Sequence, residues 1–115
     1  VKRFRVLTLQ ALGLGLGDAA VGLRYETVAR PAAFHWPEWS ARLKARIVAA
    51  CDELESKWGS SLAEVNAGSI AVGVVLSYVS YRLPDLRWQD GRPQLAAFHA
   101  GFANRDSMLR TPIGG

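Results

Sequence analysis

A single carboxylate interrupts an apolar pattern near the start of this 115-residue chain. Residues spaced alternately by three and four positions form a row along one face of a predicted helix. Asp18 lies in that row, and the other members are apolar or aromatic: Phe4, Leu7, Ala11, Leu14, Val21, Tyr25 and Val28. A carboxylate that becomes covered needs a partner, because an unpaired buried charge is too costly to persist. Asp18 therefore either pairs with an arginine or a backbone N–H at an interface, or meets a cationic ligand group across a subunit boundary.

A glycine-rich motif overlaps the same row. The run Gly15-Leu16-Gly17-Asp18-Ala19-Ala20 fits the G-x-G-x-x-A fingerprint of dinucleotide-binding proteins. That fingerprint requires a strand before it and a βαβ unit around it. Residues 6–9 could form such a strand, but no second parallel strand follows before the helical pattern of residues 39–58. Helical periodicity explains the segment better.

Few other side chains in the sequence could act as nucleophiles or metal ligands. The one cysteine, Cys51, excludes an intrachain disulfide and is consistent with a reducing compartment. It neighbours the apolar face of a predicted helix, so we expect a core residue rather than a nucleophile. His35 and His99 are the only histidines, which does not support a metal site. We predict no catalytic residue and no metal ligand in this chain.

Net charge and hydropathy limit the classes of partner that the chain is expected to bind. Fourteen Lys and Arg residues against ten Asp and Glu residues give a net charge of +4, spread without an aromatic-interleaved stripe. This balance does not favour nucleic acid as a partner. The basic start followed by apolar residues is similar to a signal peptide or a weak membrane span. Gln10, Asp18 and the nearby glycines disfavour both, so we expect no membrane partner and interpret the valine start as that of a fragment.

The first helix has two apolar faces. It should end near Ala29, because Pro31 disfavours helical geometry at Arg30. Besides the row that contains Asp18, a second face is formed by Leu9, Leu12, Leu16, Ala19 and Leu23. A helix with two apolar faces must be covered twice, once by its own domain and once by something else.

The remaining pattern is helical as well. We predict helices over residues 37–57, from a Ser69 N-cap to Arg82, and from Pro93 with Leu95, Phe98 and Phe102 facing inward. Trp88 anchors the loop of residues 85–92, and residues 106–110 form a last turn before Thr111-Pro112. The prediction is an all-α bundle of about five helices, forming one domain over residues 1–115.

Several short motifs follow one another along nearly the whole chain. They are Ala11-Leu12, Asp18-Ala19, Arg24-Tyr25-Glu26 and Arg30-Pro31; Trp36-Pro37-Glu38-Trp39 and Cys51-Asp52-Glu53-Leu54-Glu55; Ser69-Ile70-Ala71-Val72, Leu76-Ser77-Tyr78 and Arg82; and Arg92-Pro93-Gln94-Leu95 and Arg105-Asp106-Ser107-Met108 with Thr111-Pro112. In this order they resemble the C-terminal helical domain of bacterial glutathione S-transferases. Many members have an aspartate where Val72 stands, which completes a capping box with the serine, so the cap at Ser69 is expected to be half made.

The resemblance implies a function that this chain does not complete alone. In that family a thioredoxin-like N-terminal domain binds most of the glutathione and holds the residue that stabilises its thiolate, and no such domain is found here. The implied protein is a cytoplasmic, dimeric detoxification enzyme that conjugates glutathione, its co-substrate, to small electrophiles. Its implied partners are the N-terminal domain and a second copy of the chain. The alternative is a non-catalytic transferase-like binding or scaffold domain.

The resemblance also assigns roles to single residues. By position, Asp18 matches an aspartate that reaches the γ-glutamyl ammonium of glutathione in the neighbouring subunit. Arg24, Tyr25 and Val28 are expected to line the electrophile pocket, and Ser69 is the expected structural N-cap.

Overall fold

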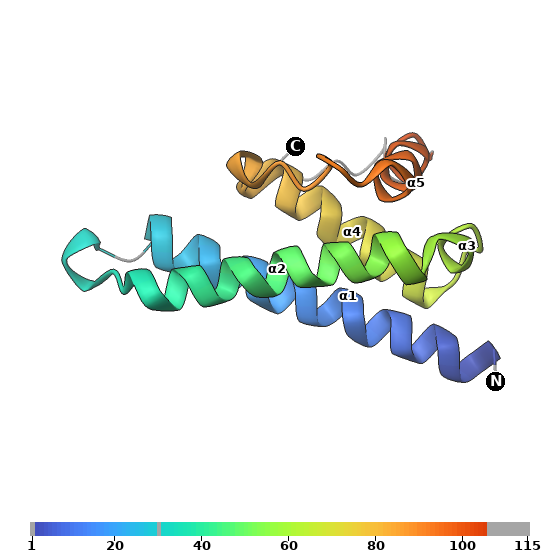
Figure 1. Ribbon diagram of the computed structural model, residues 1–115, viewed down its shortest axis with the longest axis horizontal. Helices are drawn as coiled ribbons and strands as arrows, with labels where there is room; N and C mark the ends of the chain where they lie inside the picture. Colours follow the sequence, from blue (N-terminus) through green and yellow to red (C-terminus); the bar gives the residue numbers. More distant parts are fainter. Residues whose placement is uncertain (1, 30, 106–115) are drawn as a thin grey trace.

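A computed structural model describes residues 2–29 and 31–105, and all the regular structure in those ranges is helical. Two long helices, α1 and α2, run antiparallel, and α4 and α5 lie on one side of them (Figure 1). The prediction of an all-α bundle of about five helices is confirmed. The bounds are α1 Lys2–Arg24, continued by a π-helical turn Tyr25–Ala29; α2 Pro37–Lys57; α3 Gly59–Leu62; α4 Ala67–Arg82; and α5 Pro93–Ala103, with 3-10 turns at Ala32–Phe34 and Pro84–Leu86.

Proline chemistry explains where several helices start and stop. Pro37 and Pro93 occupy the first turn of α2 and α5, where a missing N–H costs nothing. Pro84 follows the end of α4. The predicted helix over residues 37–57 and the predicted end of the first helix near Ala29 agree with the structure. Residues 6–9, considered as a strand, lie within α1, and the predicted turn at 106–110 with Thr111-Pro112 lies outside the described residues.

The hydrophobic core is formed by side chains from one face of each long helix. From α1 it takes the second apolar face, with Leu9, Leu16, Ala19 and Leu23 buried as predicted and Leu12 packed at its margin. Trp88 is buried and anchors its loop, also as predicted. The core is completed from the other helices by Leu43, Ile47, Cys51 and Leu54 of α2, Val72, Leu76 and Val79 of α4, and Leu95 of α5.

The crossing of α1 and α4 is tight because glycines lie at it. A Cβ atom at Gly68 would lie 2.9 Å from the carbonyl oxygen of Val6 and 3.0 Å from the Cβ of Leu9. A Cβ atom at Gly13 would lie 3.2 Å from the backbone nitrogen of Val72. The two helices therefore run in parallel, with backbone nearly against backbone, and this contact positions the rest of α1.

The start of α4 differs from the sequence prediction. The helix begins at Ala67, and Asn66 is its N-cap. The Asn66 side-chain oxygen accepts the Ser69 N–H at 3.0 Å, and the Ser69 hydroxyl oxygen accepts the Asn66 N–H at 3.0 Å. Ser69 is therefore the third helical residue of a reciprocal capping box and not the N-cap. The expectation of a half-made cap is also wrong, because Asn66 supplies the partner that Val72 cannot.

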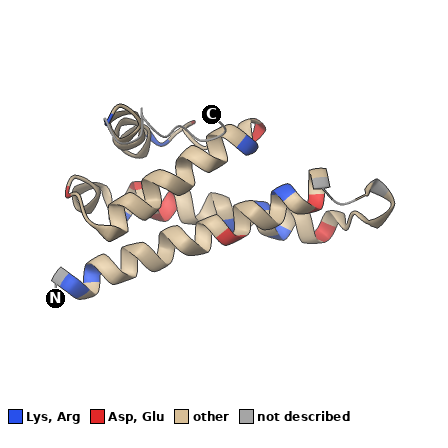
Figure 2. Ribbon diagram, turned by 180° about the vertical axis from the view of Figure 1, so that it is seen from behind, with Lys and Arg blue, Asp and Glu red and all other residues tan. Residues whose placement is uncertain are grey.

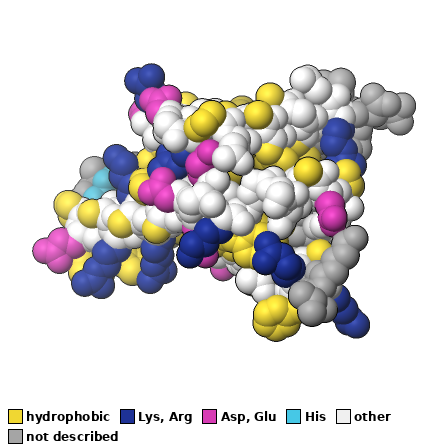
Figure 3. All heavy atoms as spheres, turned by 45° about the vertical axis from the view of Figure 1, so that its right-hand side comes forward, with side chains coloured by type: hydrophobic (Ala, Val, Ile, Leu, Met, Phe, Trp, Pro, Cys, Tyr) yellow, Lys and Arg dark blue, Asp and Glu magenta, His cyan; other side chains and the backbone are white. Residues whose placement is uncertain are grey.

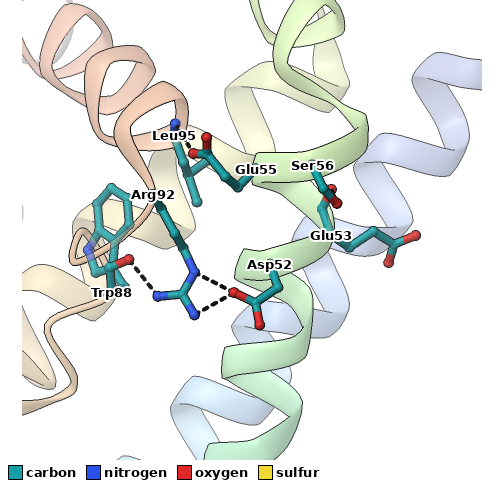
Figure 4. Close-up of polar contacts among 7 residues, drawn as sticks. All are labelled: Asp52, Glu53, Glu55, Ser56, Trp88, Arg92 and Leu95. Carbon is teal, nitrogen blue, oxygen red and sulfur yellow. Dashed lines mark hydrogen bonds and ion pairs between the residues drawn. The ribbon is translucent and has the colours of Figure 1, made fainter.

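Polar contacts join α2 to α5 across the bundle (Figure 4). The Arg92 guanidinium forms an ion pair with Asp52 at 2.7 Å and also donates to the Trp88 carbonyl oxygen at 2.9 Å. One carboxylate oxygen of Glu55 accepts the Leu95 N–H at 2.8 Å, so an anion caps the first turn of α5. Two of the motifs quoted above thus meet in space.

The capping box predicts the effect of removing its hydroxyl. Ser69→Ala should lower the free energy of unfolding by about 1–2 kcal/mol, because the partly buried hydrogen bonds of the Ser69 hydroxyl to the Asn66 N–H and the Glu64 carbonyl oxygen are both lost. Urea denaturation of the variant measures this. Ser56→Ala, at an exposed position of α2, should change stability by less than about 0.5 kcal/mol. Equal midpoints for the two variants would show that the box contributes nothing.

The helix crossing predicts opposite effects for two glycines. Gly68→Ala should lower the free energy of unfolding by about 1–2 kcal/mol, because the added methyl group meets backbone and Leu9 atoms that cannot retreat cheaply. Gly15→Ala, in α1 with no atom within 4 Å of its Cβ position, should raise it by about 0.5–1 kcal/mol. Thermal unfolding of both variants tests the pair, and a stabilised Gly68→Ala variant would contradict the close crossing.

Candidate functional site

α1 buries one apolar face and leaves the other uncovered. Phe4 is 74% exposed, and Leu7, Leu14, Val21, Tyr25 and Val28 are each more than half exposed. On neighbouring α4, Ile70, Val74 and Tyr81 are also exposed. Hydrophobic side chains lie between Lys and Arg side chains at the surface shown in Figure 3. The predicted two apolar faces are therefore present, and the residues that the structure describes cover only one of them.

Asp18 lies within the uncovered row, and its side chain is exposed. It makes no hydrogen bond or ion pair with any residue in the described ranges 2–29 and 31–105. Neither sequence interpretation is decided by this, because both place the partner in another molecule. What the chain itself provides is a carboxylate centred on an apolar helix face.

A cavity of about 550 Å³ lies at one end of the bundle, which is within the size range of small-molecule sites. Its walls come from the C-terminal part of α1, the N-terminal half of α2 and the turn after α4. In Figure 1, α1 and α2 extend past the end of α4. The residues that line the cavity belong to these three helix ends and the turn after α4. Its apolar lining includes Leu23, Val28, Leu83 and Leu86.

Two of the three residues expected in a substrate pocket line this cavity. Arg24 and Val28 are among its walls, whereas Tyr25 is not and lies 60% exposed on the uncovered row. The Arg24 guanidinium donates to the carbonyl oxygen of Arg82 at 3.0 Å. That carbonyl belongs to the last residue of α4, where helix carbonyls lack partners and a cation is favoured.

Sequence reasoning missed several polar residues around the cavity. Lys44 and Arg82 line it, together with Asp85. The one available signal was Pro84, which marks the end of α4 and so places Arg82 at a helix terminus. Also missed was Glu26, which is 2% exposed and accepts the Trp36 N–H at 2.6 Å, holding the start of α2 against α1.

Nucleophile and metal chemistry find no support in this part of the protein. Burial raises the pKa of the Cys51 thiol to about 11, so the thiol stays protonated near neutral pH. His99 pairs with the Ser77 hydroxyl at 2.9 Å and lies edge-on to Trp88, and burial lowers its pKa. Among the described residues, no group of His, Cys, Asp and Glu side chains is arranged to hold a metal ion.

The first helix is apolar enough to pass a test for membrane spans. A window within Arg3–Val28 has a mean hydropathy of 1.5, and one third of it is buried in the structure. A single such helix near the N-terminus is weak evidence, since core helices of soluble proteins and signal sequences share these properties.

Comparison with solved structures finds glutathione transferases over nearly the whole chain. A family member from Pseudomonas fluorescens with bound S-(propanoic acid)-glutathione is 39% identical, with a TM-score of 0.91; the match covers 95% of this chain and 56% of that one. The same family member with bound glutathione gives a TM-score of 0.92 at 39% identity, covering 95% and 54%. A glutathione S-transferase from Methylobacterium radiotolerans in complex with glutathione sulfonate is 26% identical, with a TM-score of 0.77, covering 91% and 51%.

The chain thus spans a little over half the length of these transferases. No curated protein matches it. The model of the family described as "Glutathione S-transferase, C-terminal domain" matches residues 37–101, which is more than half of the chain. Together with the helical architecture, this match shows that the chain belongs to the glutathione S-transferase C-terminal domain family.

Proposed function

We propose that this chain is the helical half of an enzyme that conjugates glutathione to electrophiles in detoxification. Its share of that function would be to supply walls of the electrophile pocket and part of a dimer interface. The observation on which this rests is the exposed apolar row of α1, with Asp18 at its centre unpaired by any residue that the structure describes. A chain that spans about half of its relatives and leaves such a face open needs further protein to cover it.

Two partners would cover this surface. The first is a thioredoxin-like N-terminal domain, which would bind most of the glutathione and stabilise its thiolate. The second is another copy of the chain, because a symmetric dimer is the commonest oligomer and pairs one patch with itself. We place the protein in the reducing cytoplasm, where the free thiol of Cys51 is stable.

Glutathione is the proposed co-substrate because the similar structures hold it or its derivatives. One relative binds S-(propanoic acid)-glutathione, in which the sulfur already carries a substituent. In this chain, Asp18 is the proposed contact for the glutathione γ-glutamyl ammonium bound to the other subunit. An exposed carboxylate with no partner in the described part of the chain is suited to that role. Arg24 and Val28, at the cavity, and Tyr25, beside it, are the proposed pocket residues.

A non-catalytic binding or scaffold domain is the second candidate. This candidate requires no thiolate-stabilising residue, and the buried Cys51 thiol, whose pKa burial raises to about 11, supplies none among the described residues. The two candidates differ in the proposed N-terminal domain. A residue there that stabilises the glutathione thiolate would favour the enzyme over the scaffold.

The proposal predicts that the chain alone is inactive. Without a thiolate-stabilising domain, the glutathione thiol keeps a pKa near that of free cysteine, about 8.5. An assay with glutathione and 1-chloro-2,4-dinitrobenzene at pH 6.5 should therefore show only the buffer rate. The full-length protein is the control, and turnover by the isolated chain would contradict the division of labour.

A second prediction concerns Asp18 in the full-length dimer. Asp18→Asn should weaken glutathione binding by about 10- to 100-fold, the equivalent of one charge-assisted hydrogen bond. The KM for the electrophile should change little, because the electrophile binds elsewhere. Isothermal titration with glutathione and analytical ultracentrifugation measure affinity and dimerisation separately.

Glu38→Gln is the matched control, since Glu38 is an exposed carboxylate on α2 and should change neither quantity. A weakened Asp18→Asn dimer with intact glutathione affinity would assign Asp18 to an interface salt bridge instead.

A further inference from the structure

The cavity at the end of α4 has an excess of positive charge. Arg24 of α1, Lys44 of α2 and Arg82 of α4 line it, against the single carboxylate of Asp85. Figure 2 shows Lys and Arg segments close together where the end of α1 runs beside the start of α2. Three cations from three separate elements converge on one cavity, although like charges repel one another and gain nothing from that placement.

The three cations differ in the interactions that their side chains already make within the protein. The Arg24 guanidinium is hydrogen-bonded to the carbonyl oxygen of Arg82 and so offsets the negative end of α4. The guanidinium of Arg82 lies 4.7 Å from the centre of the Tyr81 ring, a contact that leaves its charge uncompensated. Neither Lys44 nor Arg82 forms an ion pair with any described residue. Two cations at the cavity therefore lack an anionic partner within residues 2–29 and 31–105.

The other walls of the cavity are apolar. The apolar residues that line it are Leu23, Val28, Ala41, Leu83, Pro84 and Leu86. Polar groups other than the charged ones are few: the Thr27 hydroxyl already donates to the Leu23 carbonyl oxygen, which leaves the Ser40 hydroxyl available. A complementary ligand has an apolar body and one anionic end.

We propose that the electrophiles accepted by this cavity carry a carboxylate, which Lys44 and Arg82 attract while the apolar walls hold the rest of the molecule. This inference rests on the proposed transferase function, because it assigns a substrate class to the same pocket. Arg24 shapes the site by neutralising the end of α4. Since Lys44 and Arg82 are exposed to solvent, their effect is moderate and sensitive to salt.

A matched pair of electrophiles tests the charge preference in the full-length protein. The pair is 4-chloro-3-nitrobenzoate and its methyl ester, which differ in charge at the same ring position. In both, the glutathione thiolate attacks the ring carbon that bears chlorine, a C–S bond forms, the C–Cl bond breaks and chloride leaves, while the thiol proton goes to solvent. The readout is the ratio of kcat/KM for the acid to that for the ester, normalised to the wild-type protein so that intrinsic reactivity cancels.

Lys44→Gln and Arg82→Gln should each lower this ratio by about two- to fivefold, the range for one exposed charge. Arg42→Gln is the control, because Arg42 lies exposed on α2 outside the cavity and its loss should leave the ratio unchanged. Raising the salt concentration to about 0.5 M should reduce the wild-type ratio towards that of the variants. Unchanged ratios in both cavity variants would overturn the proposal.

A failed transferase function gives a different result from a failed charge preference. If 1-chloro-2,4-dinitrobenzene is not conjugated by the full-length protein, the proposed function fails. Equilibrium titration with 4-chloro-3-nitrobenzoate in the absence of glutathione then tests the cavity directly. Binding of the acid that weakens two- to fivefold in Lys44→Gln, with no change in Arg42→Gln, supports the anion site. Equal binding of acid and ester by the wild-type protein overturns it.

Discussion

With no side chain at Gly68, the backbone of α4 lies against the Val6 carbonyl oxygen, and the position of α1 follows from that contact. Further along, Gly13 lies against the backbone of Val72, and Gly17 lies against the side chain of Val75. Because the two backbones approach so closely, α1 cannot rotate without driving a side chain into α4. This fixes which of its two apolar faces enters the core. The other face, with Asp18 in its middle, is held outward by the same contact.

The opposite side of the bundle depends on polar pairing. Arg92 links Asp52 of α2 to the loop before α5, and Glu55 accepts N–H groups from the first turn of α5. These contacts hold α5 in place, where the Phe102 ring fills the space left by Gly73 of α4. α4 is therefore packed between α1 and α5, and its C-terminal end is set at the cavity. Backbone packing on one side and charge pairing on the other together place Arg82 beside Arg24.

Much of the architecture could be predicted from periodicity and proline positions. Pro37, Pro84 and Pro93 mark helix boundaries by rules that act within a few residues, so these boundaries were correct. The start of α4 could not be obtained in this way. Asn66 and Ser69 are both good capping residues, and only their reciprocal hydrogen bonds distinguish the N-cap from the third helical position. Arg24 and Val28 were expected at a pocket, but Lys44 and Arg82 were not, because they join Arg24 only through the tertiary packing of three helices.

The parallel contact of α1 with α4 also has a consequence for synthesis on the ribosome. Val72 follows Gly13 by 59 positions, so α1 emerges long before its packing partner exists. At about 5–20 residues per second, that interval lasts about 3–12 s. During this time the face of α1 that enters the core is open to chaperones or to other nascent chains, since α4 has not yet been made. The rate of translation over α2 and α3 therefore sets how long α1 remains without its main packing partner.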